Sequence, residues 1–302
     1  MIIEDDFVET NVIWGWVDDA DIGYRWDKID LNNLKFGDTD SAGLSVHHLF
    51  PVDVGVDEVV EVADTIGMLT NKSFPDFCMH AFNCPEARKN VIKTDREVVS
   101  DKSLFLSKKR YIMSVVDNEG QRVNKLKIMG VELKKSDTSK AIKSLLMELV
   151  MAILDGRNEE ELLPMIKEMK IRFKTFPASE IAKPISVKTL KKCQDMYNTT
   201  GDMKGFPYQV RAAMFWNTLC GRTDKTIVPG DKVGLLYIRH HKSKYIAFPI
   251  DMTNFPEWFE TIQVDYDTEW EKAHKKLESY LASIGLDIQG RKDTIKQELF
   301  GF

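Results

Sequence analysis

The stretch LKFGDTDSAG, residues 34–43, places two carboxylates one residue apart between two short apolar runs. Apolar residues alternate on both sides of the turn formers, which predicts a strand, a tight turn and a second strand over residues 33–47. Asp38 and Asp40 then lie at the tip of a hairpin. Two carboxylates this close repel each other, whereas Mg2+ binds one or two protein carboxylates together with phosphate oxygens and water. The alternative is a solvated turn, because Asp, Thr and Ser are common turn residues.

The chain of 302 residues is long enough for two domains with cores of their own, and its 43% hydrophobic content is typical of a globular protein. No run of 18 apolar residues occurs, so no membrane span is expected. The four cysteines have no framework spacing and are expected as free thiols. Cys78, His80 and Cys84 could suggest zinc, but a structural zinc site needs four ligands and no fourth is evident.

Charge is distributed unevenly along the chain, although the net charge is only -5. Residues 1–40 hold eleven acidic and three basic side chains, whereas residues 102–143 hold eleven basic and four acidic ones. This asymmetry indicates an acidic neighbourhood and a separate face for a polyanion. Ordinary solvated surface is the alternative interpretation of both segments.

Hydrophobic periodicity divides the chain near residue 132 and predicts an α+β fold. The first part is expected to contain a helix over residues 57–70, a β-rich run over 105–117, a turn at 118–120 and a returning strand to 133. From Ser136 the period becomes helical. Further helices are expected over residues 136–156, 158–173, 185–197, 207–219 and 270–284, and a hairpin is expected over 232–248.

The string FGDTDS, residues 36–41, closely resembles the Y-G-D-T-D-S signature of family B DNA polymerases, where it forms the tip of a palm hairpin. Phe36 replaces the usual Tyr. Further strings resemble palm and thumb segments of that family in the same order: TDREVV (94–99), LSKKRYIMSVVDNEG (106–120), KLKIMGVELKKSDT (125–138), FPYQVRAAMFWN (206–217), GDKVGLLYIR (230–239) and YIAFP (245–249). The final KQELFGF resembles the clamp-binding tail of polymerases from T-even-like bacteriophages.

The resemblance implies a partial palm with an antiparallel sheet and helices, followed by a mainly helical thumb with a small β-hairpin element. The expected parts are a leader or partner-contacting segment at 1–33, the C-terminal half of the palm at 34–132, the thumb at 133–292 and a clamp-binding tail at 293–302. The exonuclease domain, the first palm motif (D-x-x-S-L-Y-P type) and the fingers motif (K-x3-N-S-x-Y-G type) do not occur. We therefore expect the C-terminal piece of a split polymerase. A truncated longer chain is the alternative, against which the unfamiliar leader speaks.

The same resemblance assigns the carboxylates. It implies that Asp40 is the principal metal ligand and catalytic residue, with Asp38 as its supporting neighbour. Asp95 and Glu97 match further palm carboxylates near the metals, with a surface strand pair as the alternative. The expected cofactor is Mg2+, in a two-metal site shared with a partner subunit, where the metals would stabilise the attacking and leaving oxygens.

Lys109 and Tyr111 match a K-x-Y pair that contacts the minor groove of the primer–template duplex. Strand alternation predicts that these two side chains share one face, while Lys108 and Arg110 point the other way towards phosphate or acidic palm residues. Lys127, Lys134 and Lys135 extend this basic track and are expected to contact backbone phosphates, with ordinary solvation as the alternative for each lysine. Arg211 matches a thumb position that contacts the primer strand.

The tail motif consists of Ile295, Leu299, Phe300 and Phe302. An exposed apolar end suggests a partner's pocket, and the resemblance implies a sliding clamp. The alternative is a tail packed on its own thumb.

The hypothesis is a DNA-directed DNA polymerase that is active only when assembled with an N-terminal subunit carrying the exonuclease, the fingers and the first palm motif. Its other partners would be primer–template DNA, dNTP and a sliding clamp, in the cytoplasm of the host bacterium and without a membrane. The alternative is a non-catalytic DNA-binding or clamp-tethering module of a phage replisome. A two-metal nuclease is weaker, because no nuclease motif surrounds Asp38.

Overall fold

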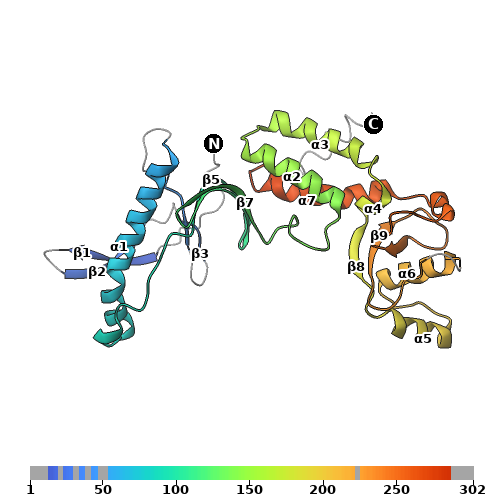
Figure 1. Cartoon of the computed structure of the whole chain (residues 1–302), viewed down its shortest axis with the longest axis horizontal. Helices are drawn as coiled ribbons and strands as arrows, with labels where there is room; N and C mark the ends of the chain where they lie inside the picture. The colour runs from blue at the N-terminus through green and yellow to red at the C-terminus, as the bar shows by residue number, and fades with distance from the viewer. Residues whose placement is uncertain are drawn as a thin grey trace. The chain divides into compact units, whose positions relative to one another are not determined.

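The computed structural model describes residues 13–19, 23–29, 34–37, 42–46, 54–221 and 225–286. The fold is α+β, as the sequence predicts (Figure 1). The chain divides into two compact units between Lys127 and Ile128, close to the expected boundary at residue 132.

The first unit contains three antiparallel β arrangements and one long helix. Its elements are β1 Ile13–Asp19, β2 Gly23–Ile29, β3 Leu34–Gly37, β4 Ala42–Leu44, α1 Val56–Phe82, the short 3-10 helix η2 Glu86–Arg88, β5 Val98–Ser107, β6 Arg110–Asn118 and β7 Gln121–Met129, whose last two residues belong to the second unit. β1 pairs with β2, β3 pairs with β4, and the remaining strands form a sheet in the order β5-β6-β7.

Both turns of the three-stranded sheet span two residues. Glu119 and Gly120 join β6 to β7, and both have positive φ angles, 51° and 85°. Such backbone geometry matches the right-handed twist of the strands, so the predicted turn is confirmed. Lys108 and Lys109 join β5 to β6, with Lys109 at φ 61°. The expectation of one β-rich run across this segment is therefore corrected to two strands.

Helix α1 is longer than the sequence predicts, because it continues through Pro75 to Phe82. It ends at Asn83, whose left-handed backbone allows its N–H to bond Cys78 O. Cys78 is its one buried residue among those described. The helix packs against β5 and β6 (Figure 1).

The second unit contains a helical layer and a small sheet with its own helices (Figure 1). Its elements are α2 Lys140–Leu154, α3 Glu159–Phe173, α4 Ala178–Ile181, β8 Lys183–Ser186, α5 Leu190–Thr200, α6 Tyr208–Leu219, β9 Lys232–Tyr237, β10 Tyr245–Pro249, the 3-10 helix η3 Glu257–Thr261 and α7 Tyr266–Ala282. α2, α3 and α7 contact one another, and α6 covers β9 and β10.

The helical layer is built on leucines at helical spacing. Leu145, Leu146 and Leu149 of α2 are each at most 1% exposed, and full burial of a leucine contributes about 1.5–3 kcal/mol. α3 begins at a capping box in which Asn158 and Glu161 bond each other's backbone N–H groups.

The sheet of the second unit has the strand order β10-β9-β8 and is antiparallel throughout. The hairpin predicted over residues 232–248 is confirmed by β9 and β10. The helix expected over 185–197 starts later, because residues 183–186 pair with β9 as a strand. Within the described residues, no helix has the length and apolar character needed to cross a bilayer.

Candidate functional site

The predicted catalytic aspartates belong to the connection between β3 and β4. These strands pair antiparallel, with Phe36 opposite Gly43 and Gly37 opposite Ala42, so the predicted strand pair is present. Asp38 and Asp40 themselves lie outside the described residues. Their role as metal ligands therefore stays a prediction.

Asp95 and Glu97 lie in an irregular segment just before β5, not on the strand that the sequence suggests. Both are exposed, and both line one open hollow of about 600 Å3. The carboxylates of Asp64 and Glu119 line the same hollow. Glu97 also pairs with Lys127 of β7, at 2.5 Å between Oε1 and Nζ. The structure thus brings two predicted site residues together in one hollow, which Arg96 also lines.

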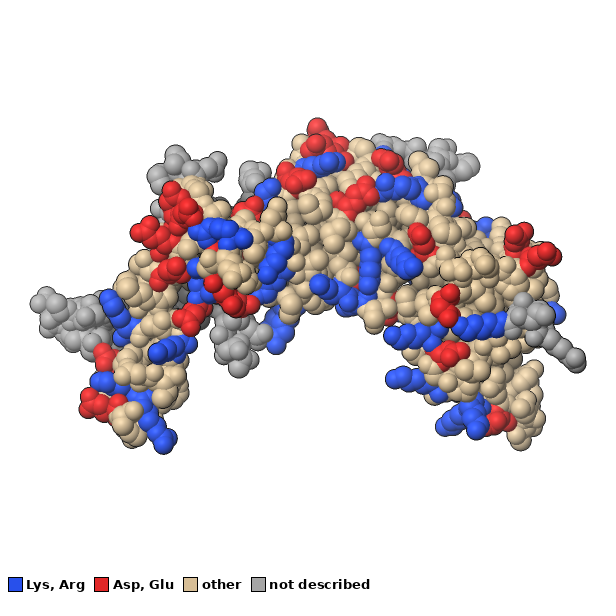
Figure 2. All heavy atoms as spheres, viewed as in Figure 1, with Lys and Arg blue, Asp and Glu red and all other residues tan. Residues whose placement is uncertain are grey.

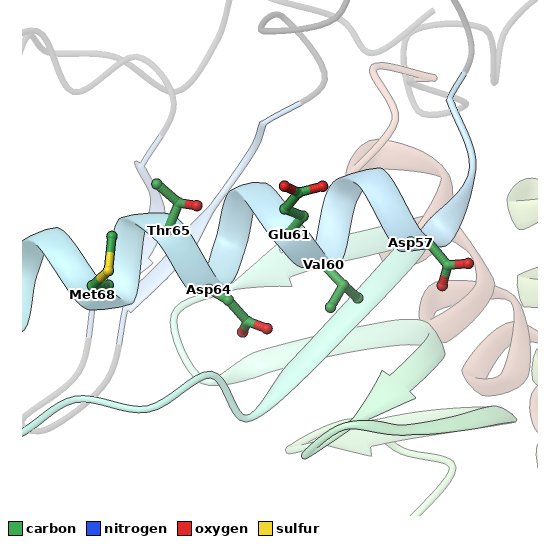
Figure 3. A pocket seen from close by; sticks show the side chains of 6 residues that line it. All are labelled: Asp57, Val60, Glu61, Asp64, Thr65 and Met68. Carbon is green, nitrogen blue, oxygen red and sulfur yellow. The ribbon is translucent and has the colours of Figure 1, made fainter.

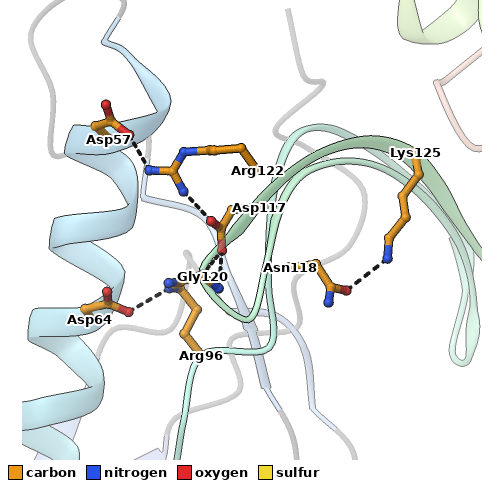
Figure 4. A network of polar contacts seen from close by, with 8 residues as sticks. All are labelled: Asp57, Asp64, Arg96, Asp117, Asn118, Gly120, Arg122 and Lys125. Atoms are coloured by element: carbon orange, nitrogen blue, oxygen red, sulfur yellow. Dashed lines mark hydrogen bonds and ion pairs between the residues drawn. The ribbon is translucent and has the colours of Figure 1, made fainter.

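Arg96, between these two residues in the chain, lines the same hollow, and its guanidinium belongs to a polar network (Figure 4). Its guanidinium donates to Asp117 of β6 and, at 2.6 Å, to Asp64 of α1. Arg122 of β7 donates to the second oxygen of Asp117 and to Asp57 of α1. Two arginines therefore bridge carboxylates of α1 to the carboxylate of Asp117 on β6, and these ion pairs hold α1 against the sheet.

Asp117 is the centre of this network and is 0% exposed. Burial raises its pKa, but hydrogen bonds from the Gly120 backbone N–H, Arg96 and Arg122 outweigh that effect, so its pKa lies below the ordinary value. The sequence motif suggested only a turn here. The sequence signal that could have identified Asp117 is its position three residues before Gly120, the glycine of the turn. From that position its carboxylate accepts a hydrogen bond from the Gly120 backbone N–H, at 3.0 Å between N and Oδ1.

The donor chemistry of the hollow suits a hard cation, because Mg2+ prefers carboxylate oxygens. However, in the part of the chain that the structure describes, no three His, Cys, Asp or Glu side chains gather closely enough to hold a metal ion. Asp64 and Glu97 are already paired with Arg96 and Lys127. Asp95 and Glu97 alone are therefore an incomplete site, and a magnesium site here requires further carboxylates. Of the residues considered for zinc, Cys78 and His80 lie near the end of α1 and Cys84 follows that helix.

The predicted minor-groove residues lie at the hairpin tip between β5 and β6. Ser107 is paired with Arg110, so Lys108 and Lys109 form the exposed turn. The expected alternation of faces over these residues is wrong, since strand alternation does not apply within a turn. Tyr111 follows on β6, with its ring 6.0 Å from that of its cross-strand partner Phe105. The tip therefore presents two lysines with Arg110 and Tyr111 directly behind them.

The remaining predicted cations have different surroundings. Lys127 is half-buried beside Glu97, and Lys135 pairs with Glu132 at 3.1 Å. Lys134 is exposed in the connection before α2, and Arg211 is exposed on α6. Figure 2 shows Lys and Arg interspersed with Asp and Glu, so charge alone does not single out a face.

One group of basic and aromatic residues in the second unit was missed by the sequence interpretation. We call it the thumb cluster, and its members are Tyr208, Arg211, Tyr237, Tyr245 and Lys272, from α6, β9, β10 and α7. Lys272 Nζ lies 3.3 Å from the centroid of the Tyr237 ring. The Tyr245 ring lies 4.7 Å from that of Tyr237 and 5.7 Å from that of Tyr208. Only the match of Arg211 to a thumb position hinted at it.

Three further lysines lie near this cluster. Burial lowers the pKa of Lys276, Glu132 and Asp137 raise it, and the charges of Lys183 and Lys135 lower it. Lys183 also pairs with Asp137 at 3.5 Å and lowers the pKa of Lys272. Lys135 pairs with Glu132 at 3.1 Å, so cations and carboxylates alternate in this region.

A second hollow, of about 410 Å3, lies beside α1 (Figure 3). Its lining residues come from one stripe of the helix and are Asp57, Val60, Glu61, Asp64, Thr65 and Met68. Among the described residues, three carboxylates and no cation line it, so it is not a surface for a polyanion such as DNA.

No family profile matches this chain. Over 291 residues it is 26% identical to the DNA-directed DNA polymerase of Enterobacteria phage T4, and the aligned region covers 86% of this chain and 31% of that protein. Over 242 residues it is 27% identical to the DNA-directed DNA polymerase of Escherichia phage RB69, and that alignment covers 72% of this chain and 25% of that protein. The aligned region therefore spans a third or less of these relatives. The resemblance indicated by the motifs is confirmed: over most of its length, the chain is similar to the DNA polymerases of T4-like bacteriophages.

Proposed function

We propose that this chain is part of a DNA-directed DNA polymerase and supplies the C-terminal half of the palm together with the thumb. The observation that carries the proposal is the similarity to the T4 phage polymerase over 86% of the chain. Because the aligned region covers only 31% of that relative, the chain would perform part of the reaction's work. Its substrates would be primer–template DNA and dNTP.

Two cationic surfaces support the DNA-binding part of the proposal. In the first unit, Lys108 and Lys109 are exposed at a hairpin tip, a position from which a side chain can enter a groove. In the second unit, Lys272 of the thumb cluster lies over the Tyr237 ring, and the charge of Arg211 acts on the pKa of Tyr245. Cations position a duplex through its phosphates, which carry no sequence information, as a replicative enzyme requires.

The carboxylates support the catalytic part. Asp38 and Asp40 would hold Mg2+, with Asp95 and Glu97 close to the site; a bound metal would stabilise charge on the attacking and leaving oxygens. Arg96 would be a positioning residue: its guanidinium, held by Asp117, would fix the segment whose carboxylates Asp95 and Glu97 line the hollow. A second polypeptide with the first palm motif would supply the missing carboxylate, and the tail at 293–302 would bind a sliding clamp.

The test measures binding of the full 302-residue chain to a fluorescently labelled primer–template duplex. Fluorescence anisotropy is the readout, at several NaCl concentrations. We expect binding whose logarithmic affinity falls linearly with the logarithm of salt concentration, because each neutralised phosphate releases counterions. The variant Lys109→Asn should weaken binding and lower the salt slope by about 0.9. The control Lys72→Asn, at an exposed position of α1, should change neither quantity.

Absence of duplex binding at low salt would contradict the proposal. Equal weakening by Lys109→Asn and Lys72→Asn would show non-specific attraction and remove the hairpin tip from the interface. A non-catalytic DNA-binding module would bind the duplex in the same way. It would differ in showing no Mg2+-dependent synthesis in any assembly.

A further inference from the structure

Tyr237 and Lys272 form a contact that the proposed DNA-binding role does not itself explain. Lys272 belongs to α7 and Tyr237 to the end of β9, yet the ammonium lies 3.3 Å from the ring centroid. A cation over an aromatic face is attracted by the negative potential of the ring. The contact therefore restrains a side chain that would otherwise sample many rotamers.

Two contacts fix Tyr237, one through its side chain and one through its backbone. Tyr245 lies directly opposite it on β10, and a hydrogen bond with the Tyr237 side chain is the largest cause of the raised pKa of Tyr245. The backbone N–H of Tyr237 donates to the buried carboxylate of Glu269, at 2.8 Å. Glu269 precedes Lys272 by three residues on α7, so this bond ties the lysine's helix to the strand carrying the ring.

Lys272 remains accessible to a ligand despite this contact, because the residue as a whole is exposed. Packing around the ammonium lowers its pKa, and the nearby Glu269, Tyr245 and Tyr208 oppose that effect. Arg211 is exposed on the adjacent helix α6 and influences the pKa of Tyr245, which places its charge on the same cluster. Two cations and the exposed ring of Tyr208 thus surround one tyrosine pair.

We propose that Tyr237 is a positioning residue, whose ring holds the ammonium of Lys272 in place for contact with a backbone phosphate of DNA. The inference rests on the proposed function, since it assumes that the thumb cluster contacts a duplex. It goes further by giving the aromatic pair a role of its own. The ring orders Lys272 before DNA arrives, so less rotamer entropy is lost on binding.

The experiment uses the full chain with the variants Lys272→Met, Tyr237→Leu, Tyr237→Phe and the double variant Tyr237→Leu/Lys272→Met. Affinity for a labelled primer–template duplex is measured at several salt concentrations. We expect Lys272→Met to lower affinity about tenfold and the salt slope by about 0.9, because one phosphate contact is lost. Tyr237→Leu should lower affinity about threefold without changing the salt slope. Tyr237→Phe should keep the affinity of the unsubstituted chain, because it keeps the aromatic ring.

The double variant separates positioning from a general structural role. If Tyr237 acts through Lys272, adding Tyr237→Leu to Lys272→Met should cause no further loss of affinity. An equal loss in both backgrounds would overturn the inference, and so would Tyr237→Phe binding as weakly as Tyr237→Leu. The control Lys167→Met, at an exposed position of α3, should leave affinity unchanged.

A readout without DNA keeps the two proposals distinguishable. In the free protein, the ε-methylene protons of Lys272 should resonate upfield, because they lie over an aromatic face. This shift should persist in Tyr237→Phe and vanish in Tyr237→Leu. If the upfield shift is present but no duplex binds, the proposed function fails while the contact stands. If the duplex binds but the shift is absent in the unsubstituted chain, the positioning role fails alone.

Discussion

The buried carboxylate of Asp117 accepts a hydrogen bond from Arg96 (Figure 4), which stands in the chain between the exposed residues Asp95 and Glu97. Asp117 therefore anchors Arg96 in the middle of the irregular segment before β5, and Asp95, Arg96 and Glu97 all line one hollow. Asp117 is thus connected to the candidate palm carboxylates through one side chain.

Removing the charge of Asp117 should destabilise the first unit and change its response to acid. The pKa of Asp117 lies below the ordinary 3.8, so its contribution to stability is complete above that value and is lost as pH falls through the lower, folded-state pKa. We expect Asp117→Asn to lower the melting temperature at pH 7 and to flatten its decline below about pH 4. Thermal melts at several pH values measure this. The control Asp101→Asn, at an exposed position of β5, should retain the unsubstituted decline; identical curves for the two variants would contradict the assignment.

Glu269 should show the opposite pH dependence. Burial raises its pKa above the ordinary 4.5, so folding favours the protonated form. Its contribution to stability is full below about pH 4.5 and is lost as pH rises through the folded-state pKa. Glu269→Gln keeps an oxygen for the Tyr237 N–H but has no charge to bury. We expect this variant to be at least as stable as the unsubstituted chain at pH 7, with a smaller decline between about pH 4 and 7.

Denaturant titrations at those pH values provide the measurement, and Glu271→Gln, on the exposed side of the same helix, is the matched control. A Glu269→Gln variant that is much less stable at pH 7 would mean that the carboxylate's charge supports the fold.

The hairpin tip offers a prediction about backbone conformation. Lys109 has a φ of 61°, in the left-handed region that costs most residues about 1 kcal/mol and that Asn and Gly tolerate better. Lys109→Asn should therefore leave the melting temperature unchanged or slightly raised, while its duplex affinity falls. Lys109→Val should be less stable, because a β-branched residue is disfavoured there. Equal melting temperatures for the two variants would contradict the left-handed conformation.

Deletion of residues 293–302 tests the clamp-binding proposal. The apolar motif residues of this segment lie outside the described part of the chain, so the prediction rests on sequence. We expect the shortened chain to bind primer–template DNA unchanged but to lose retention on an immobilised phage sliding clamp. The double substitution Phe300→Ala/Phe302→Ala should reproduce the loss. Clamp retention by both variants would assign the contact elsewhere.

The sequence predicted long periodic elements better than tips and edges. α3 begins where Asn158 and Glu161 form a capping box, and the turn at Glu119 and Gly120 carries glycine where a positive φ is needed. In contrast, Lys108 and Lys109 are not typical turn residues, so their turn was interpreted as continuous strand. Residues 183–186 became a strand because β9 offered pairing partners, a tertiary effect that outweighs local preference.

The candidate site was predictable only as far as its motifs reached. FGDTDS and KKRY single out residues whose chemistry is local, whereas the thumb cluster gathers Tyr208, Tyr237 and Lys272 from three distant segments. The sequence likewise does not single out Asp117, because its role depends on hydrogen bonds from Arg96 and Arg122, which belong to other segments. Contacts between distant segments leave no periodic pattern in a single sequence.

The most direct test of the central claim is Mg2+-dependent primer extension by this chain, mixed with the polypeptide that carries the first palm motif. We predict extension by the mixture, none by this chain alone, and loss of activity with Asp40→Asn while co-purification of the two polypeptides persists. Synthesis at an undiminished rate by the Asp40→Asn mixture would contradict the account, because the hairpin between β3 and β4 would then hold no catalytic metal.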